Sequence, residues 1–219
     1  MNAGRTATMQ QPAPVRAGHR LELEIARTAT AVFAAKGVER TSLTDIADAA
    51  GIPTSLLWDR FAAKEDCLVP LFSYATERIA RRMDSWSMDR PLIDAFDAYE
   101  TFGTEGGDGG NWLVPAGSDG AERLDAALDA LRLARDEPVV HAVWLRESFA
   151  ALPLVASAIA ARAGRSRPDL DATVQAGMLL SALQLALREY AWTPPEARHA
   201  DLPDTLLEAV RIAMRGLPA

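Results

Sequence analysis

The segment from Thr41 to Lys64 constrains the fold of this chain most, because it carries local signals for two short helices separated by a glycine turn. Ser42 and Asp45 have the spacing of a capping box, which predicts a helix that starts near Leu43. Gly51 tolerates a left-handed backbone and predicts the end of that helix. Together these signals indicate a helix-turn-helix, a unit that places a short helix in the major groove of DNA.

The second short helix of this segment is expected to follow Pro53, whose missing N–H is no loss in a first helical turn. Leu57 and Phe61 form its inward-facing stripe. The polar side chains that remain face outward, with hydroxyls and an arginine suited to base edges and an indole and a lysine suited to phosphates. We therefore predict DNA contacts from Ser42, Thr44, Thr54, Ser55, Trp58, Arg60 and Lys64.

From Arg20 to Leu68 the chain resembles the N-terminal domain of TetR/AcrR-family transcriptional regulators. The residues that carry the resemblance, in the order and spacing of that domain, are Phe33, Lys36-Gly37, Thr41-Ser42, Ile46-Ala47, Ala50-Gly51, Trp58, Phe61 and Lys64-Glu65. Ser55-Leu56 stand where the family usually has Gly-Thr, and Trp58 stands where it usually has tyrosine. Leu56 has no polar hydrogen to donate to a phosphate, whereas the indole of Trp58 has one.

The charge of the chain is divided unevenly along its length. The net charge is −7, yet residues 1–64 hold 8 Lys+Arg against 6 Asp+Glu, a balance of +2, and the rest hold 15 against 24, a balance of −9. The positive excess therefore lies at the end expected to meet phosphates. Cys67 is the only cysteine, which excludes an internal disulfide. With no long apolar run and no signal-peptide core, we expect a cytoplasmic protein with no membrane partner.

The rest of the chain predicts helices and no strands, so the expected fold is all-α with about nine helices. We divide it into a disordered tail over 1–18, a helix-turn-helix DNA-binding domain over 19–64, and a larger ligand-binding and dimerisation domain over 65–219. Within the last domain we expect helices over 64–88, 91–99, 121–135, 138–164 with a bend or restart at Pro153, 170–192 and 202–214. The glycine-rich stretch 103–110 is interpreted as a linker, because neither a preceding strand nor a following Lys-Ser/Thr supports a phosphate loop.

The helix expected over 170–192 is apolar around more of its circumference than one core contact needs. It is either a central core helix or a helix whose second side is a subunit interface. In the TetR/AcrR family the last two long helices form a four-helix bundle with a symmetry mate. The resemblance therefore implies a homodimer through the segments 170–192 and 202–214.

Aromatic side chains are concentrated in the middle of the chain, and several polar groups are set into otherwise apolar helices. Core packing explains most of the aromatic residues, but a buried polar group needs a partner, which is either another side chain or a ligand. The resemblance implies a small-molecule pocket in this region. The candidate ligand-binding residues are Trp86, Phe96, Tyr99, Phe102, His141, Trp144, Glu147, Met178 and Gln184.

No pattern of residues supports catalysis, a cofactor or a metal site. The three histidines lie on separate segments, and no nucleophile elbow, Walker loop or dinucleotide fingerprint occurs. The favoured function is a ligand-responsive transcriptional regulator, a repressor that a small apolar or aromatic effector releases from a near-palindromic DNA operator. One alternative is a helical interaction module that has lost DNA binding, indicated by Leu56 and Asp59. A helical enzyme is the other, without a supporting constellation.

Overall fold

The computed structural model describes residues 13–84 and 118–215. Over these residues the chain forms nine α-helices, two 3-10 helices and no strand, so the predicted all-α fold of about nine helices is confirmed. The α-helices are α1 (Ala13–Lys36), α2 (Leu43–Ala50), α3 (Thr54–Trp58), α4 (Val69–Asp84), α6 (Ser118–Leu133), α7 (Pro138–Phe149), α8 (Leu152–Arg162), α9 (Leu170–Trp192) and α10 (Leu202–Arg215). The 3-10 helices are η1 (Glu65–Leu68) and η2 (Pro195–Ala197). The helix expected over 91–99 and the linker expected over 103–110 lie outside the described residues.

Most helix ends fall where local sequence signals place them. Helix α8 begins at Leu152, two residues after Ala150, which caps the end of α7, and Pro153 lies in the first turn of α8. The side chain of Asp169 accepts a hydrogen bond from the backbone N–H of Ala172 and so caps α9. Helix α9 spans the residues expected for it, since its polar cap and the Pro194-Pro195 pair bound it on either side.

Two helix starts differ from the expectation. Helix α1 begins at Ala13, inside the tail predicted over 1–18, because Pro14 is compatible with a first helical turn and alanine favours the helix. The rest of the expected tail lies outside the described residues. The helix expected from Lys64 is instead divided into η1 and α4, because Pro70 has no N–H to continue the helical bonding across the junction.

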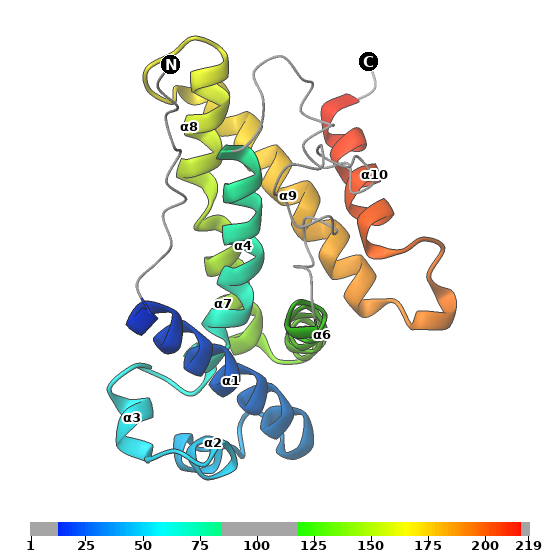
Figure 1. The fold of residues 1–219 in the computed structure, drawn as a ribbon. Coiled ribbons are helices and arrows are strands. Elements are labelled where there is room, and N and C mark those ends of the chain that lie inside the picture. The colour runs from blue at the N-terminus through cyan, green and yellow to red at the C-terminus, as the bar shows by residue number, and fades with distance from the viewer. Residues whose placement is uncertain (1–12, 85–117, 216–219) are drawn as a thin grey trace, which may run out of the picture.

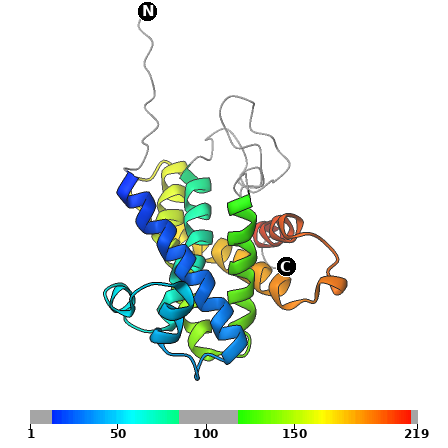
Figure 2. The same cartoon turned by 60° about the horizontal axis from the view of Figure 1, so that its bottom comes forward.

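The helices are arranged as a small head at one end of a larger helical body. Figure 1 shows α2 and α3 below α1. Helix α4 rises from this end with α7 beside its lower part and α8 beside its upper part, and α9 and α10 lie along the other flank. In Figure 2 the head comes forward, and α6 lies next to α1. The body therefore holds the head through α1, α4 and α6 rather than through one linker.

The buried side chains form two clusters whose division does not fall at residue 64. The first joins the head, through Phe33, Ile46 and Leu57, to Leu131 of α6 and Trp144 of α7. The second joins the far half of α4 to α8, α9 and α10. The buried core continues across residue 64, so no break in packing marks the domain boundary expected there. That boundary stays a proposed division by function.

Two segments are long and apolar enough to span a membrane by length and composition, Pro138–Arg162 and Leu170–Trp192. This differs from the expectation that no apolar run reaches that length. The first segment is divided between α7 and α8, and the second packs against α8 and α10. Core helices of soluble proteins can have the same length and apolar composition, so these two features are weak evidence for a membrane span.

Candidate nucleic-acid interface and internal cavity

Helix α2 begins with the predicted capping box. The hydroxyl of Ser42 accepts from the backbone N–H of Asp45 at 3.1 Å, and the Asp45 carboxylate accepts from the backbone N–H of Ser42 at 2.7 Å. The ammonium of Lys36 lies 2.6 Å from the other carboxylate oxygen, and together with Ser42 it lowers the pKa of Asp45 below its ordinary value. The Ser42 hydroxyl, predicted to contact DNA, is therefore already engaged in the cap.

The turn between α2 and α3 has the backbone that Gly51 predicts. Gly51 has φ 65°, and its N–H and that of Ile52 return to the carbonyl oxygens of Asp48 and Ala47 at 3.2 and 3.1 Å. This left-handed cap stops α2 and starts α3 directly after Pro53. Leu57 of α3 is fully buried, as the inward stripe predicted. The short helix α3 is thereby held at the edge of the head.

Five of the seven predicted DNA-contacting residues are exposed, and Ser42 and Arg60 are among them. Thr44 on α2 and Ser55 on α3 are exposed, and Thr54 is half-buried. Trp58, at the end of α3, has 63% of its surface exposed. An indole this exposed contributes little to the core, so its N–H is available to an outside acceptor.

The two cations expected to bind DNA both have partners inside the chain. The ammonium of Lys64 donates to the carbonyl oxygen of Val38 at 2.6 Å and to that of Glu39 at 3.3 Å. The guanidinium of Arg60 lies 3.9 Å from the carboxylate of Glu22 on α1. Lys64 therefore ties the turn after α1 to η1, and one of its three N–H groups remains for a phosphate.

A polar connection between head and body was missed by the sequence analysis. Arg146 of α7 lies 3.0 Å from the carboxylate of Asp66 in η1 and 2.9 Å from that of Glu147, and these bonds raise the pKa of Arg146. The hydroxyl of Thr76 on α4 donates to the backbone carbonyl of Glu147 at 2.9 Å. Asp66 and Arg146 are 80 positions apart, and no local pattern signals such a pair.

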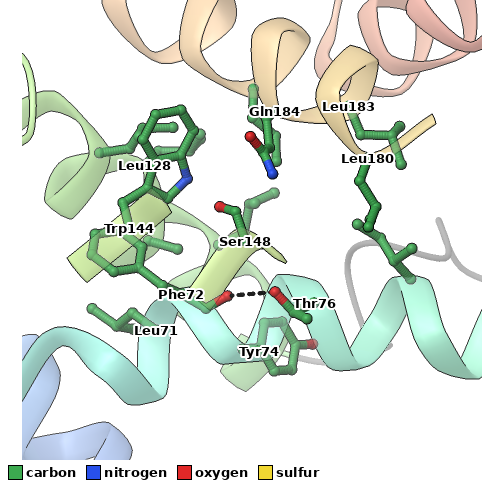
Figure 3. Close-up of a pocket in the computed structure, with 15 residues that line it drawn as sticks. Leu71, Phe72, Tyr74, Thr76, Leu128, Trp144, Ser148, Leu180, Leu183 and Gln184 are labelled. Atoms are coloured by element: carbon green, nitrogen blue, oxygen red, sulfur yellow. Dashed lines mark hydrogen bonds between the residues drawn. The ribbon is translucent and has the colours of Figure 1, made fainter. Parts of the chain in front are cut away.

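An internal cavity of about 50 Å³ lies between α4, α6, α7 and α9 (Figure 3). Its wall is mostly aliphatic and aromatic, and no charged side chain of the described residues lines it. The lining residues are Leu71, Phe72, Tyr74, Thr76, Ile79, Leu124, Ala127, Leu128, Leu131, Trp144, Ser148, Leu180, Leu183, Gln184 and Leu187. The sequence predicts the apolar faces of these helices, but no sequence pattern predicts the space that remains between them.

Two of the predicted ligand-binding residues, Trp144 and Gln184, line this cavity. The ring of His141 instead lies against that of Trp144 in a tilted arrangement, with ring centroids 5.4 Å apart and an angle of 60° between the ring planes. Glu147 pairs with Arg146, and Met178 lies on the outer side of α9 with its side chain exposed. The other four candidates, Trp86, Phe96, Tyr99 and Phe102, lie outside the described residues.

The outer sides of α9 and α10 form a groove of about 1060 Å³. Its apolar wall includes the exposed side chains of Met178, Leu185 and Ile212. The inner side of α9, by contrast, buries Leu179, Leu180 and Leu183 in the core. Helix α9 thus has the apolar character on two sides that its composition indicated, and one of the two sides is uncovered in the single chain.

The described residues contain no group of three or more His, Cys, Asp or Glu side chains that could hold a metal ion. Cys67 is buried in the core of the head. Burial raises the pKa of its thiol to about 12, so the thiolate needed for nucleophilic or metal chemistry is disfavoured at neutral pH.

A capped helix-turn-helix at one end of an all-α body defines the class of helix-turn-helix DNA-binding regulators. Residues 25–70 match the family model described as bacterial regulatory proteins, tetR family. Over these residues the chain is similar to the tetR family of regulators, in agreement with the resemblance seen in the sequence. No protein of curated function matches the sequence.

Three solved structures share the fold. FadR of Thermus thermophilus, a TetR-family transcriptional repressor in complex with lauroyl-CoA, is 18% identical with a TM-score of 0.51, over 90% of this chain and 95% of its own. GusR of Salmonella enterica is 17% identical with a TM-score of 0.50, over 95% of this chain and 99% of its own. A protein of Mesorhizobium loti described as a TetR-family transcriptional regulator is 19% identical with a TM-score of 0.50, over 90% and 96%.

Proposed function

We propose that the protein is a ligand-responsive repressor that binds a near-palindromic operator as a homodimer and leaves it when a small effector binds the body. It would act in the cytoplasm, where the operator DNA lies, and by binding rather than by catalysis. The observation that carries this proposal is the capped α2–Gly51–α3 unit, which presents Trp58 and Ser55 at one end of the molecule.

The outer surface of α3 supports a role in DNA binding. Its exposed Ser55 hydroxyl and Trp58 indole are neutral donors, and neutral donors commonly position a protein on phosphates. Lys64 and Arg60 would contribute less than their charge implies, because both are already bonded within the chain. We therefore assign the largest share of phosphate contact to Trp58.

The uncovered side of α9 and α10 supports a homodimer through the last two long helices. Exposed apolar side chains along both helices form one surface, and water-exposed apolar surfaces of this kind favour burial against another protein. A twofold dimer would present two heads to successive major grooves, whose centres lie about 34 to 36 Å apart.

The cavity supports control by a small effector. Helix α7 lines it with Trp144 and Ser148, and the same helix holds Asp66 beside the head through Arg146. At about 50 Å³ the cavity offers the space of roughly four water molecules, so a larger molecule can enter only if its walls move apart. An effector that favours the widened state would shift α7 and with it the head.

The interaction-module alternative has two observations in its favour. Asp59 is exposed directly after Trp58, where its carboxylate would repel phosphates, and the cations of Arg60 and Lys64 are paired within the chain. A module that binds another protein through Trp58 would keep the same exposed indole.

A gel shift with the intergenic DNA upstream of the chain's own coding sequence separates the two functions. The repressor proposal predicts a shifted complex that survives excess unrelated DNA and weakens with salt. The Trp58→Ala variant serves as the matched control, because the exposed side chain is absent but the fold is kept. If wild-type protein shifts the upstream fragment no better than unrelated DNA, the repressor proposal is wrong and the interaction module is favoured.

A further inference from the structure

One polar group in the cavity wall, the side-chain amide of Gln184, has a donor with no hydrogen-bond partner among the described residues. The side-chain nitrogen Nε2 of Gln184 is buried and donates no hydrogen bond. Figure 3 shows this side chain on α9 directed toward Ser148 of α7, across the cavity. A buried donor left without an acceptor costs the full desolvation of that group, so a ligand acceptor at this position would recover the lost bond.

The rest of the wall limits what such a ligand can be. The Thr76 hydroxyl is already within hydrogen-bond distance of the carbonyl oxygens of Glu147 and Phe72. No charged side chain of the described residues lines the cavity. A carboxylate or an ammonium would find no countercharge among the described residues of this wall, and burying an unpaired charge is far more costly than burying a neutral polar group.

We propose that the cavity, when its walls move apart, takes a small neutral molecule with an apolar body and one hydrogen-bond acceptor, such as a ketone, an ester or a lactone. The oxygen of this molecule accepts from Nε2 of Gln184, and its apolar body packs between α7 and α9. This inference rests on the proposed effector function and narrows it, because free acids and acyl phosphates are excluded as effectors.

Three probes of similar size test the chemistry by titration calorimetry on the full chain. Acetophenone carries a carbonyl, α-methylstyrene replaces that oxygen with a methylene group, and benzoate carries a charge. Acetophenone is expected to bind about three- to tenfold tighter than α-methylstyrene, the ratio that one net hydrogen bond provides. Benzoate is expected to bind more weakly than either.

The Gln184→Met variant removes the donor and keeps most of the side-chain volume. It should bind α-methylstyrene at least as well as the wild type and lose the preference for acetophenone. Gln175→Met is the matched control, because Gln175 lies on the exposed side of the same helix, bonded to Asp171. This variant should keep the wild-type preference.

The inference is overturned if the preference for acetophenone persists in Gln184→Met, if benzoate binds as tightly as acetophenone, or if none of the probes binds the wild type. Operator release is measured separately with the same probes. A Gln184-dependent preference without DNA release would support the ligand chemistry and contradict the proposed repressor mechanism. Release by benzoate alone would keep the repressor mechanism and overturn the ligand chemistry.

Discussion

The head and the α9–α10 face both expose apolar side chains, but in different patterns. The head exposes one large aromatic residue, Trp58, among hydroxyls and charged groups. The α9–α10 face exposes a series of aliphatic and thioether side chains along two helices: Val174, Met178, Leu185, Ile212 and Met214. An isolated indole suits a polar partner such as a phosphate, whereas an extended apolar surface suits another protein. The difference assigns separate partners to the two ends of the molecule.

The largest effect is expected from a charge on the inner side of α9. Leu183 is 1% exposed and belongs to the core that joins α9 to α8 and α10. Leu183→Glu removes a packed side chain, which costs about 2 to 5 kcal/mol, and leaves a buried carboxylate without a partner. We expect loss of helical content by circular dichroism at ordinary temperature. A folded Leu183→Glu dimer would show that α9 is not a core helix.

The next largest effect is expected two residues along the same helix. Leu185 is 52% exposed on the groove side of α9, so Leu185→Glu should leave the chain folded. At a twofold interface the two introduced carboxylates lie near each other and oppose association. Sedimentation should report a folded monomer where the wild type is a dimer. A Leu185→Glu protein that stays dimeric would show that the subunit interface does not lie on this face of α9.

A smaller effect, confined to DNA, is expected from the exposed indole. Trp58→Ala should weaken operator binding about tenfold, the loss of one hydrogen bond to a charged phosphate oxygen. Trp58→Phe keeps the ring and removes the N–H, so it should weaken binding about as much. Fluorescence anisotropy with labelled operator measures both. If Trp58→Phe binds like the wild type, the ring rather than the N–H makes the contact.

Local signals predicted the head well, and non-local packing explains what was missed. The capping box at Ser42 and the left-handed cap at Gly51 each involve only residues a few positions away in the sequence, so the sequence alone could place them. The bond from Lys64 to Val38 and the contact from Arg146 to Asp66 join distant segments. No periodicity contains that information.

The body shows the same limit more strongly. Periodicity predicted the bounds of α9 and that it is apolar on two sides, but not which leucine faces the core. It also could not distinguish Gln184, which lines the cavity, from Met178, which lies on the surface. A cavity depends on how neighbouring helices are spaced, and that spacing is set by side chains from four separate helices.

The smallest effect is expected from acid. Bonds to Lys36 and Ser42 lower the pKa of Asp45 from its ordinary value of 3.8, so the stabilisation is present above that value and is lost as the pH falls through the folded-state pKa. Asp45→Asn should be slightly less stable than the wild type at neutral pH. The difference in stability should begin to decrease as the pH falls below 3.8 and should vanish only below the lowered folded-state pKa of Asp45. Thermal unfolding of both proteins at a series of pH values measures this difference in stability. A difference that does not change with pH would show that Asp45 does not contribute to the loss of stability in acid.

The central claim is that two heads, held together by α9 and α10, bind one operator. The most direct test is the mass of the protein–DNA complex, measured by analytical ultracentrifugation. The DNA is a duplex that carries the operator located by footprinting in the upstream intergenic region. Two chains per duplex are expected, with half-sites about 10 base pairs or a multiple of that apart, and Leu185→Glu should form no such complex. One chain per duplex, or equal binding of a scrambled duplex, would contradict it.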